Sequence, residues 1–119
     1  GDRLAHAVRR AFDRGARRVF CLGADCPALE RRHLREAGRH LDDGADAVFG
    51  PTEDGGYYLL AQSAFHPGLF RDIPWSAPDT LEVSLRRAAE AGLRAARLET
   101  LFDVDTEPDW HRGREFIHR

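Results

Sequence analysis

The amino-acid sequence predicts one α/β domain, a sandwich of helices on a mainly parallel, mixed sheet. Helical and strand patterns alternate along the 119 residues, and such alternation is typical of parallel sheets covered by helices. The expected strands are short continuous apolar runs, as in strands buried on both faces. A turn-rich segment at residues 51–56 indicates a hairpin, which makes the sheet mixed.

Three elements are expected in the first part of the chain. Apolar residues at helical spacing predict a helix over residues 3–14. A buried strand should follow over residues 19–23. Pro27 fits the first turn of a second helix, which would end near Asp42.

The middle of the chain has the pattern of a hairpin followed by an irregular stretch. Strands are expected over residues 45–50 and 57–61, on either side of the turn-rich segment. Residues 65–78 show no regular pattern, apart from one short helical turn expected at residues 68–70.

The last third should return to alternating elements. An amphipathic helix is expected from Leu81 until Gly92 ends it, followed by a fourth strand over residues 93–98. Residues 101–105 should be extended. A helix of about eight residues, capped by Thr106, would then finish the chain.

Composition excludes several classes of protein. Hydrophobic residues make up 42% and charged residues 32% of the chain, so a disordered protein is not expected. No apolar run approaches the roughly 20 residues that span a bilayer, and the net charge of -2 argues against nucleic-acid binding. All 18 basic residues are arginine, which excludes a P-loop or Schiff-base lysine within this sequence.

The ends of the chain and its cysteines and histidines add further expectations. The sequence carries no signal-peptide pattern, so we expect a cytoplasmic protein. It does not begin with Met, so we expect that its N-terminal part is absent here. Cys21 and Cys26 are five apart and match no zinc motif, and Cys21 is expected in the core. His33 and His40 are seven apart and also fail as a metal pair.

Asp25 is the strongest single candidate for an active-site residue. It follows the expected strand 19–23, and ligands of open α/β sheets bind beyond the carboxyl ends of the strands. The amides that begin the next helix, near Pro27, would favour phosphate at the same place. A carboxylate beside phosphate requires a cation between them, so Asp25 would hold Mg²⁺ or Mn²⁺. The alternative is that Asp25 only caps the helix.

The second candidate cluster is the turn between the two hairpin strands. Glu53 and Asp54 place two carboxylates on one loop, and Gly55 and Gly56 would let the backbone approach a ligand closely. The alternative is an ordinary Asp-Gly hairpin turn with solvated acids.

The third cluster lies near the C-terminus. If residues 103–105 are extended, Asp103 and Asp105 project to the same face, and one of them could complete a metal site with Asp25. The alternative is helix-start chemistry, in which these acids complement the helix dipole behind Thr106.

Two weaker signals complete the set. Trp75, followed by Ser76, lies in the irregular stretch and could stack on a base or a sugar, although an aromatic residue more often simply packs. The arginine pairs at 17–18 and 31–32 are expected to be solvated and not to clamp phosphate.

Taken in order, these motifs resemble those of one bacterial family. The motifs are Gly23-Ala24-Asp25-Cys26-Pro27, Gly50-Pro51 with Glu53-Asp54-Gly55-Gly56-Tyr57-Tyr58, Trp75-Ser76, and Asp103-Val104-Asp105-Thr106-Glu107-Pro108-Asp109. They resemble the GT-A-like transferase family found beside radical-SAM or selenoprotein-associated genes, which is labelled a glycosyltransferase family, with arsenosugar biosynthesis suggested for some members. The wider superfamily includes the molybdenum-cofactor and phospholactate nucleotidyltransferases.

The resemblance implies a three-layer, Rossmann-like GT-A fold of the nucleotide-diphospho-sugar transferases and dependence on a divalent metal. It also implies that Asp25 meets the metal and that Asp103 is its partner. Two features depart from the family. Its first strand and its glycine- and basic-rich nucleotide loop are missing from this sequence, and the C-terminal motif has Glu107 and Pro108 in exchanged order.

We therefore expect transfer of a sugar from a nucleotide-diphosphate sugar to a small acceptor. Mg²⁺ or Mn²⁺ at Asp25, Asp103 and Asp105 would neutralise the diphosphate leaving group, and Asp54 would orient the acceptor or accept its proton. Substrate contacts are expected from Gly23, Pro27, Glu53, Gly55, Gly56, Tyr57, Trp75 and Ser76. Two alternatives stay open: nucleotidyl transfer from an NTP to a phosphorylated small acceptor with release of pyrophosphate, and a non-catalytic α/β assembly module. Neither nucleic acid nor a membrane is expected as a partner, and the oligomeric state stays open.

Overall fold

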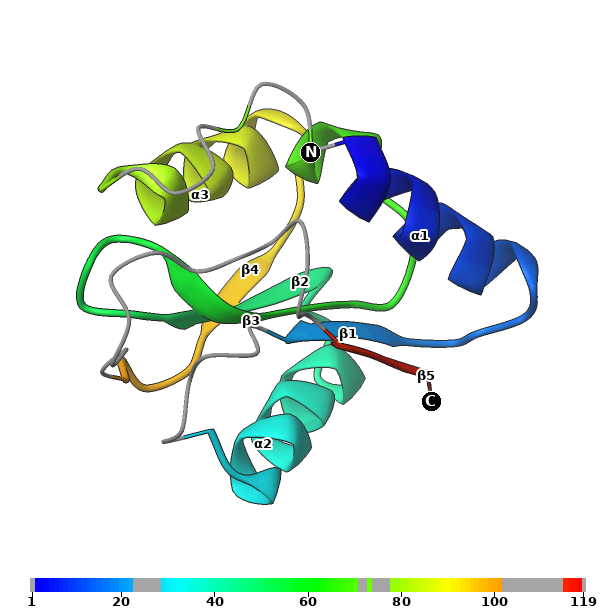
Figure 1. Cartoon of the computed structure of the whole chain (residues 1–119), viewed down its shortest axis with the longest axis horizontal. Helices are drawn as coiled ribbons and strands as arrows, with labels where there is room; N and C mark the ends of the chain where they lie inside the picture. Colours follow the sequence, from blue (N-terminus) through cyan, green and yellow to red (C-terminus); the bar gives the residue numbers. More distant parts are fainter. Residues whose placement is uncertain (1, 23–28, 71–72, 74–77, 102–114, 119) are drawn as a thin grey trace.

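The computed structural model describes residues 2–22, 29–70, 73, 78–101 and 115–118 (Figure 1). The elements in chain order are α1 (Asp2–Asp13), β1 (Val19–Leu22), α2 (Arg31–Asp42), β2 (Ala47–Pro51), β3 (Tyr57–Gln62), the 3₁₀ turn η1 (Pro67–Leu69), α3 (Thr80–Glu90), β4 (Ala95–Arg97) and β5 (Glu115–His118). The expected hairpin, the short helical turn and the fourth strand are confirmed. Among the described residues, no helix is both long and apolar enough to span a membrane.

The helices cover both faces of one sheet. α1 and α3 lie on one face and α2 lies on the other (Figure 1). Each face has its own buried cluster, because side chains alternate along a strand: Val19 and Cys21 of β1 belong to the cluster under α1 and α3, and Phe20 and Leu22 to the cluster under α2. Cys21 is a core residue, as expected.

The sheet is mostly antiparallel, which corrects the prediction of a mainly parallel one. The strand order is β4-β2-β3-β1-β5. β3 runs antiparallel to β1 and to β2, and β5 runs antiparallel to β1. Among the strands that the structure describes, only β2 and β4 form a parallel pair. The apolar runs were a sign of burial on both faces and not of strand direction. A turn as short as residues 52–56 returns the chain antiparallel, whereas a parallel connection needs a crossover.

Two element boundaries also differ from the prediction. α2 begins at Arg31 and not near Pro27, because Glu30 is the N-cap residue and has extended backbone angles (φ -127°, ψ 167°). Its N–H donates to the His33 side chain. At the other end, Glu115–His118 forms strand β5 beside β1, which the sequence did not predict. The expected helix of about eight residues and its cap at Thr106 lie outside the described residues.

A β-bulge in the hairpin decides which face of the sheet each of two adjacent tyrosines occupies. Pro51 pairs with Tyr57 and Gly50 pairs with Leu59, so Tyr58 is the extra residue. A bulge inserts one residue and redirects the side chains around it. As a result Tyr57 packs under α1 and α3, and both Tyr58 and Leu59 pack under α2.

Candidate functional site

One edge of the sheet gathers the ends of all the described strands. β1, β2 and β4 run in the same direction and end at this edge, at Leu22, Pro51 and Arg97. β3 and β5 run the other way and begin there, at Tyr57 and Glu115. The chain therefore enters and leaves the sheet repeatedly at one place, which is where loops can bring distant residues together.

Seven of the predicted site residues lie outside the described residues: Gly23, Asp25, Pro27, Trp75, Ser76, Asp103 and Asp105. Several of the residues that flank them are described and lie at this edge. Leu22 pairs with Glu115 across β1 and β5, and Leu101 forms an isolated parallel bridge with Thr52. Leu22 and Leu101, which adjoin in sequence the stretches with the predicted metal ligands, therefore lie at the same edge of the sheet as residues 52–56, the acidic loop that carries Glu53 and Asp54.

Asp54, the predicted catalytic carboxylate, is held in one orientation. Its Oδ1 accepts a hydrogen bond from the Thr52 hydroxyl and another from the Gly56 N–H (3.2 Å). Thr52 is buried, whereas Asp54 is exposed. Oδ2 has no hydrogen-bond partner among the described residues, so a carboxylate oxygen of fixed direction is available to accept a hydrogen bond or a proton.

The paired glycines of the loop allow a close contact within the chain. Gly55 has a φ of 94°, a conformation that glycine adopts easily and other residues rarely do. A Cβ atom at Gly55 would lie 1.7 Å from the Pro78 carbonyl oxygen. The Gly55 carbonyl accepts a hydrogen bond from Leu81 N–H (2.8 Å) at the start of α3, and the Gly56 carbonyl accepts one from Thr52 N–H (3.0 Å). The close backbone approach that we predicted for a ligand is made here to Pro78.

Glu53 joins the acidic loop to the segment after β4. Its N–H donates to the Leu101 carbonyl (3.2 Å), and the Leu101 N–H donates to the Pro51 carbonyl (2.9 Å). The Glu53 side chain is exposed, as a substrate contact requires. The backbone thus holds Leu101, two residues before Asp103, against the loop that carries Glu53 and Asp54.

Tyr57 is a core residue, which corrects its prediction as a substrate contact. Its side chain has no exposed surface. The ring packs edge-to-face on Phe49 (5.1 Å between centroids), and its hydroxyl lies 3.4 Å from the Ser84 hydroxyl of α3. Burial raises the pKa of the Tyr57 phenol. The bulge directs this ring into the buried cluster under α1 and α3, and the sequence alone gives no sign of the bulge.

A polar cluster that sequence reasoning missed lies under α2. His33 is fully buried, and its ring contacts Glu99 and Tyr58. The pKa of the Glu99 carboxyl is lowered, first by the hydrogen bond with His33 and then by that with Arg32. Because the pKa of this carboxyl is lower in the folded protein, the contact stabilises the fold at pH values above the ordinary pKa of a glutamate. This stabilisation is lost as the pH falls through the lowered pKa. The available signal was the position of His33, three residues after the N-cap, where a side chain can return a hydrogen bond to Glu30 N–H.

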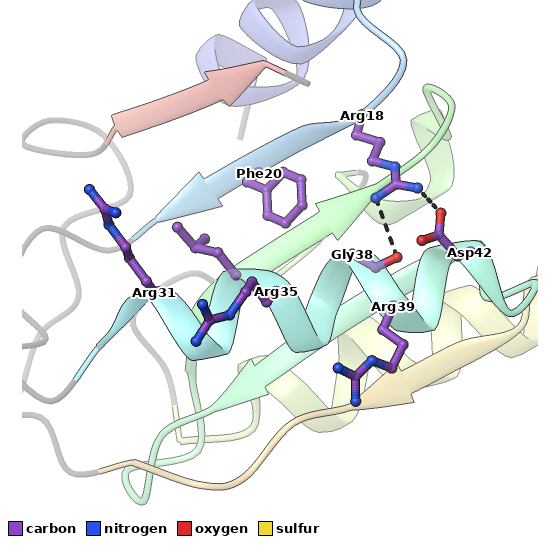
Figure 2. A pocket seen from close by; sticks show the side chains of 8 residues that line it. Arg18, Phe20, Arg31, Arg35, Gly38, Arg39 and Asp42 are labelled. Carbon is purple, nitrogen blue, oxygen red and sulfur yellow. Dashed lines mark hydrogen bonds and ion pairs between the residues drawn. The ribbon is translucent and has the colours of Figure 1, made fainter.

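A basic hollow of about 770 Å³ runs along α2 and β1 (Figure 2). At one end Arg18 donates to the Gly38 carbonyl (3.3 Å) and pairs with Asp42, so Arg18 is a tether between β1 and α2 and not a solvated flank. Three arginines one turn apart on α2 have no ion-pair partner among the described residues: Arg31, Arg35 and Arg39. This hollow is lined by guanidinium groups, so it is not the predicted metal site.

The described residues alone do not form a metal centre. No three His, Cys, Asp or Glu side chains in this part of the chain lie close enough together to hold an ion. The predicted metal ligands Asp25, Asp103 and Asp105 lie outside this part of the chain, and their carboxylate oxygens are of the kind that suits Mg²⁺ or Mn²⁺.

One known protein family matches more than half of the chain. Residues 1–77 match the family model described as "Uncharacterized protein conserved in bacteria (DUF2064)". The chain belongs to the DUF2064 family. The match includes the Asp25 motif, the acidic loop and Trp75.

A solved structure extends the comparison beyond the family model. The DUF2064 chain is similar to the crystal structure of a proposed nucleotide-diphospho-sugar transferase from Desulfovibrio desulfuricans G20, with 34% identity and a TM-score of 0.79. The similarity covers 87% of this chain and 45% of that protein, so the chain spans just under half the length of its structural neighbour. No curated protein matches the chain.

Proposed function

We propose that this DUF2064 chain is the metal-binding edge of a transferase that moves a sugar from a nucleotide-diphosphate sugar to a small acceptor. The observation that carries the proposal is the similarity, in sequence and in fold over 87% of the chain, to the Desulfovibrio protein. Function belongs to a site and not to a fold, so the proposal also needs an edge that can bring the predicted residues together.

The topology of the described strands supports such an edge. Leu22 and Leu101 are separated by three inter-strand spacings, about 14 Å in all. Asp25 lies three residues beyond Leu22, and Asp103 lies two residues beyond Leu101. Because an extended chain covers about 3.5 Å per residue, both carboxylates have enough chain to reach one ion.

In this proposal the chain's acidic residues have separate roles. Asp25, Asp103 and Asp105 hold Mg²⁺ or Mn²⁺, which when bound neutralises the diphosphate leaving group. Asp54 offers its free Oδ2 to the acceptor hydroxyl, because Thr52 and Gly56 fix the other oxygen. Glu53, on the same loop, contacts the acceptor from the exposed side.

The loop and its flanking segments complete the proposed cleft. Gly55 and Gly56 shape the loop by their backbone contacts. Gly23, Pro27, Trp75 and Ser76 remain proposed substrate contacts, with the ring of Trp75 stacked on a base or a sugar.

Product analysis of the full-length protein tests the proposal. With Mn²⁺ and UDP- or GDP-sugars, we expect a nucleoside diphosphate to be released. Replacing Asp54 with Asn should lower kcat by about 10²-fold to 10⁴-fold, the usual contribution of a general base. Thr52→Val, which frees Asp54 without changing the volume of the side chain, should cause a smaller loss. Asp43→Asn, an exposed acid at the other end of α2, is the matched control and should have wild-type activity.

Other products would contradict the proposal in distinguishable ways. Release of pyrophosphate from an NTP would indicate nucleotidyl transfer instead. A protein that releases neither product and binds no nucleotide would fit the assembly module. Equal activity of Asp54→Asn and Asp43→Asn would remove Asp54 from the reaction.

A further inference from the structure

We propose that His33 is a positioning residue. It holds the start of α2 and the acidic loop in one fixed arrangement at the edge of the sheet where β1, β2 and β4 end. The inference rests on the proposed function for its effect on metal binding. It rests on the described residues alone for its geometry.

The imidazole of His33 bridges two segments that are far apart in the sequence. Nδ1 lies 2.8 Å from the Glu30 N–H, just before α2, and Nε2 lies 2.7 Å from Glu99 Oε1, after β4. A backbone N–H can only donate, so Nδ1 is the acceptor. The neutral ring therefore carries its proton on Nε2 and donates it to Glu99.

Glu99 passes this constraint on to its neighbours. Its carboxylate also pairs with Arg32 (2.5 Å), one residue before His33. Its backbone carbonyl accepts a hydrogen bond from the Tyr58 hydroxyl (3.0 Å), and the Tyr58 ring packs edge-to-face on His33 (5.6 Å between centroids, 72°). The segment after β4 is thus fixed both at a side chain and at the backbone.

The constraint continues into the acidic loop. Leu101, two residues after Glu99, is bonded through its backbone to Pro51 and to Glu53. A continuous series of contacts therefore leads from His33 through Glu99 and Leu101 to the loop that carries Asp54. Two members of this series, Glu30 and Leu101, lie five residues after Asp25 and two residues before Asp103 in the sequence.

A purely structural role would not require these groups. His33 is buried but Glu99 is exposed. A pair that water reaches adds little net stability, whereas its directional bonds fix geometry. Substituting a residue that orients the metal ligands, but does not itself contact the metal, commonly lowers the affinity for the metal.

Two substitutions at His33 separate its two hydrogen bonds. His33→Asn keeps an acceptor near the Nδ1 position but cannot reach Glu99, whereas His33→Gln keeps a donor near the Nε2 position. In the full-length protein, His33→Asn should weaken Mn²⁺ binding by about tenfold, and His33→Gln should restore most of the affinity. His40→Asn, the same substitution two turns along α2, should leave the affinity unchanged.

Hydrogen exchange gives a second readout that needs no metal. The amides of Glu53 and Leu101 should exchange about tenfold faster in His33→Asn than in wild type or His40→Asn, because the local opening of their segment becomes easier. Glu99→Ala should have at least the same effect, because it also removes the ion pair with Arg32. Its combination with His33→Asn should have less than the sum of the two effects, since both changes break the contact between His33 and Glu99.

The outcomes separate this inference from the proposed function. If Asp25→Asn abolishes Mn²⁺ binding while His33→Asn binds Mn²⁺ normally, the positioning role is wrong and the proposed function stands. If Mn²⁺ binding is absent or does not depend on Asp25, the proposed function fails. In that case unchanged exchange at Glu53 and Leu101 overturns the positioning role, and faster exchange supports it.

Discussion

Replacing Gly55 with alanine should lower the free energy of unfolding by about 2–5 kcal/mol. A φ of 94° costs an L-residue about 1–2 kcal/mol. The new Cβ would also lie 1.7 Å from the Pro78 carbonyl oxygen, and relieving such an overlap typically costs about 1–3 kcal/mol more. Urea denaturation followed by circular dichroism measures the loss.

Gly15→Ala is the matched control for Gly55. Gly15 has a φ of 99°, and a Cβ there would meet nothing within 4 Å. Its substitution should therefore cost only the backbone strain, about 1–2 kcal/mol. Equal losses for the two variants would show that the contact between Gly55 and Pro78 does not constrain the loop.

Gly50→Ala should be the second most damaging change and should lower the free energy of unfolding by about 1.5–4.5 kcal/mol. A Cβ at Gly50 would lie 2.4 Å from Cζ of the buried Tyr58 ring. The ring is held by its hydroxyl bond to the Glu99 carbonyl, so it can move away only by breaking that bond. Overpacking at about 1–3 kcal/mol and a lost hydrogen bond at about 0.5–1.5 kcal/mol give the expected loss.

A double-mutant cycle identifies the cause of the Gly50 effect. Tyr58→Leu removes the atoms that Gly50→Ala would meet, so the double variant should be more stable than the sum of the single losses predicts, by about 1 kcal/mol or more. Gly68→Ala, whose Cβ would meet only Ala91 Cβ at 4.0 Å, should change stability little. Strict additivity between positions 50 and 58 would contradict this account of the bulge.

Most of the described elements could be predicted from the sequence, but strand β5 and the strand directions could not. Continuous apolar runs show that Val19–Leu22 and Tyr57–Gln62 are buried on both faces, and burial of this kind is equally compatible with parallel and antiparallel neighbours. The place of β5 beside β1 depends on residues about 95 positions apart in the sequence. No local pattern contains that information.

The part of the candidate site that lies within one local sequence motif could be predicted. The turn with Glu53, Asp54 and two glycines was visible in the sequence, and the structure adds the partners that orient Asp54. The sequence excludes His33 as a metal ligand but does not predict its contact with Glu99, because Glu99 is 66 residues away. Tyr57 and Tyr58 are both buried, and the bulge decides which face of the sheet each ring occupies.

The central claim is that a divalent cation at Asp25 joins this edge to the diphosphate of a nucleotide sugar. Calorimetric titration of the full-length protein with Mn²⁺, with and without UDP or GDP, tests it most directly. We predict that metal and nucleotide strengthen each other's binding in the wild type and in Asp43→Asn, and that Asp25→Asn weakens Mn²⁺ binding by about a hundredfold or more, as loss of a direct oxygen ligand should. Equal Mn²⁺ affinity in Asp25→Asn and the wild type would contradict the claim.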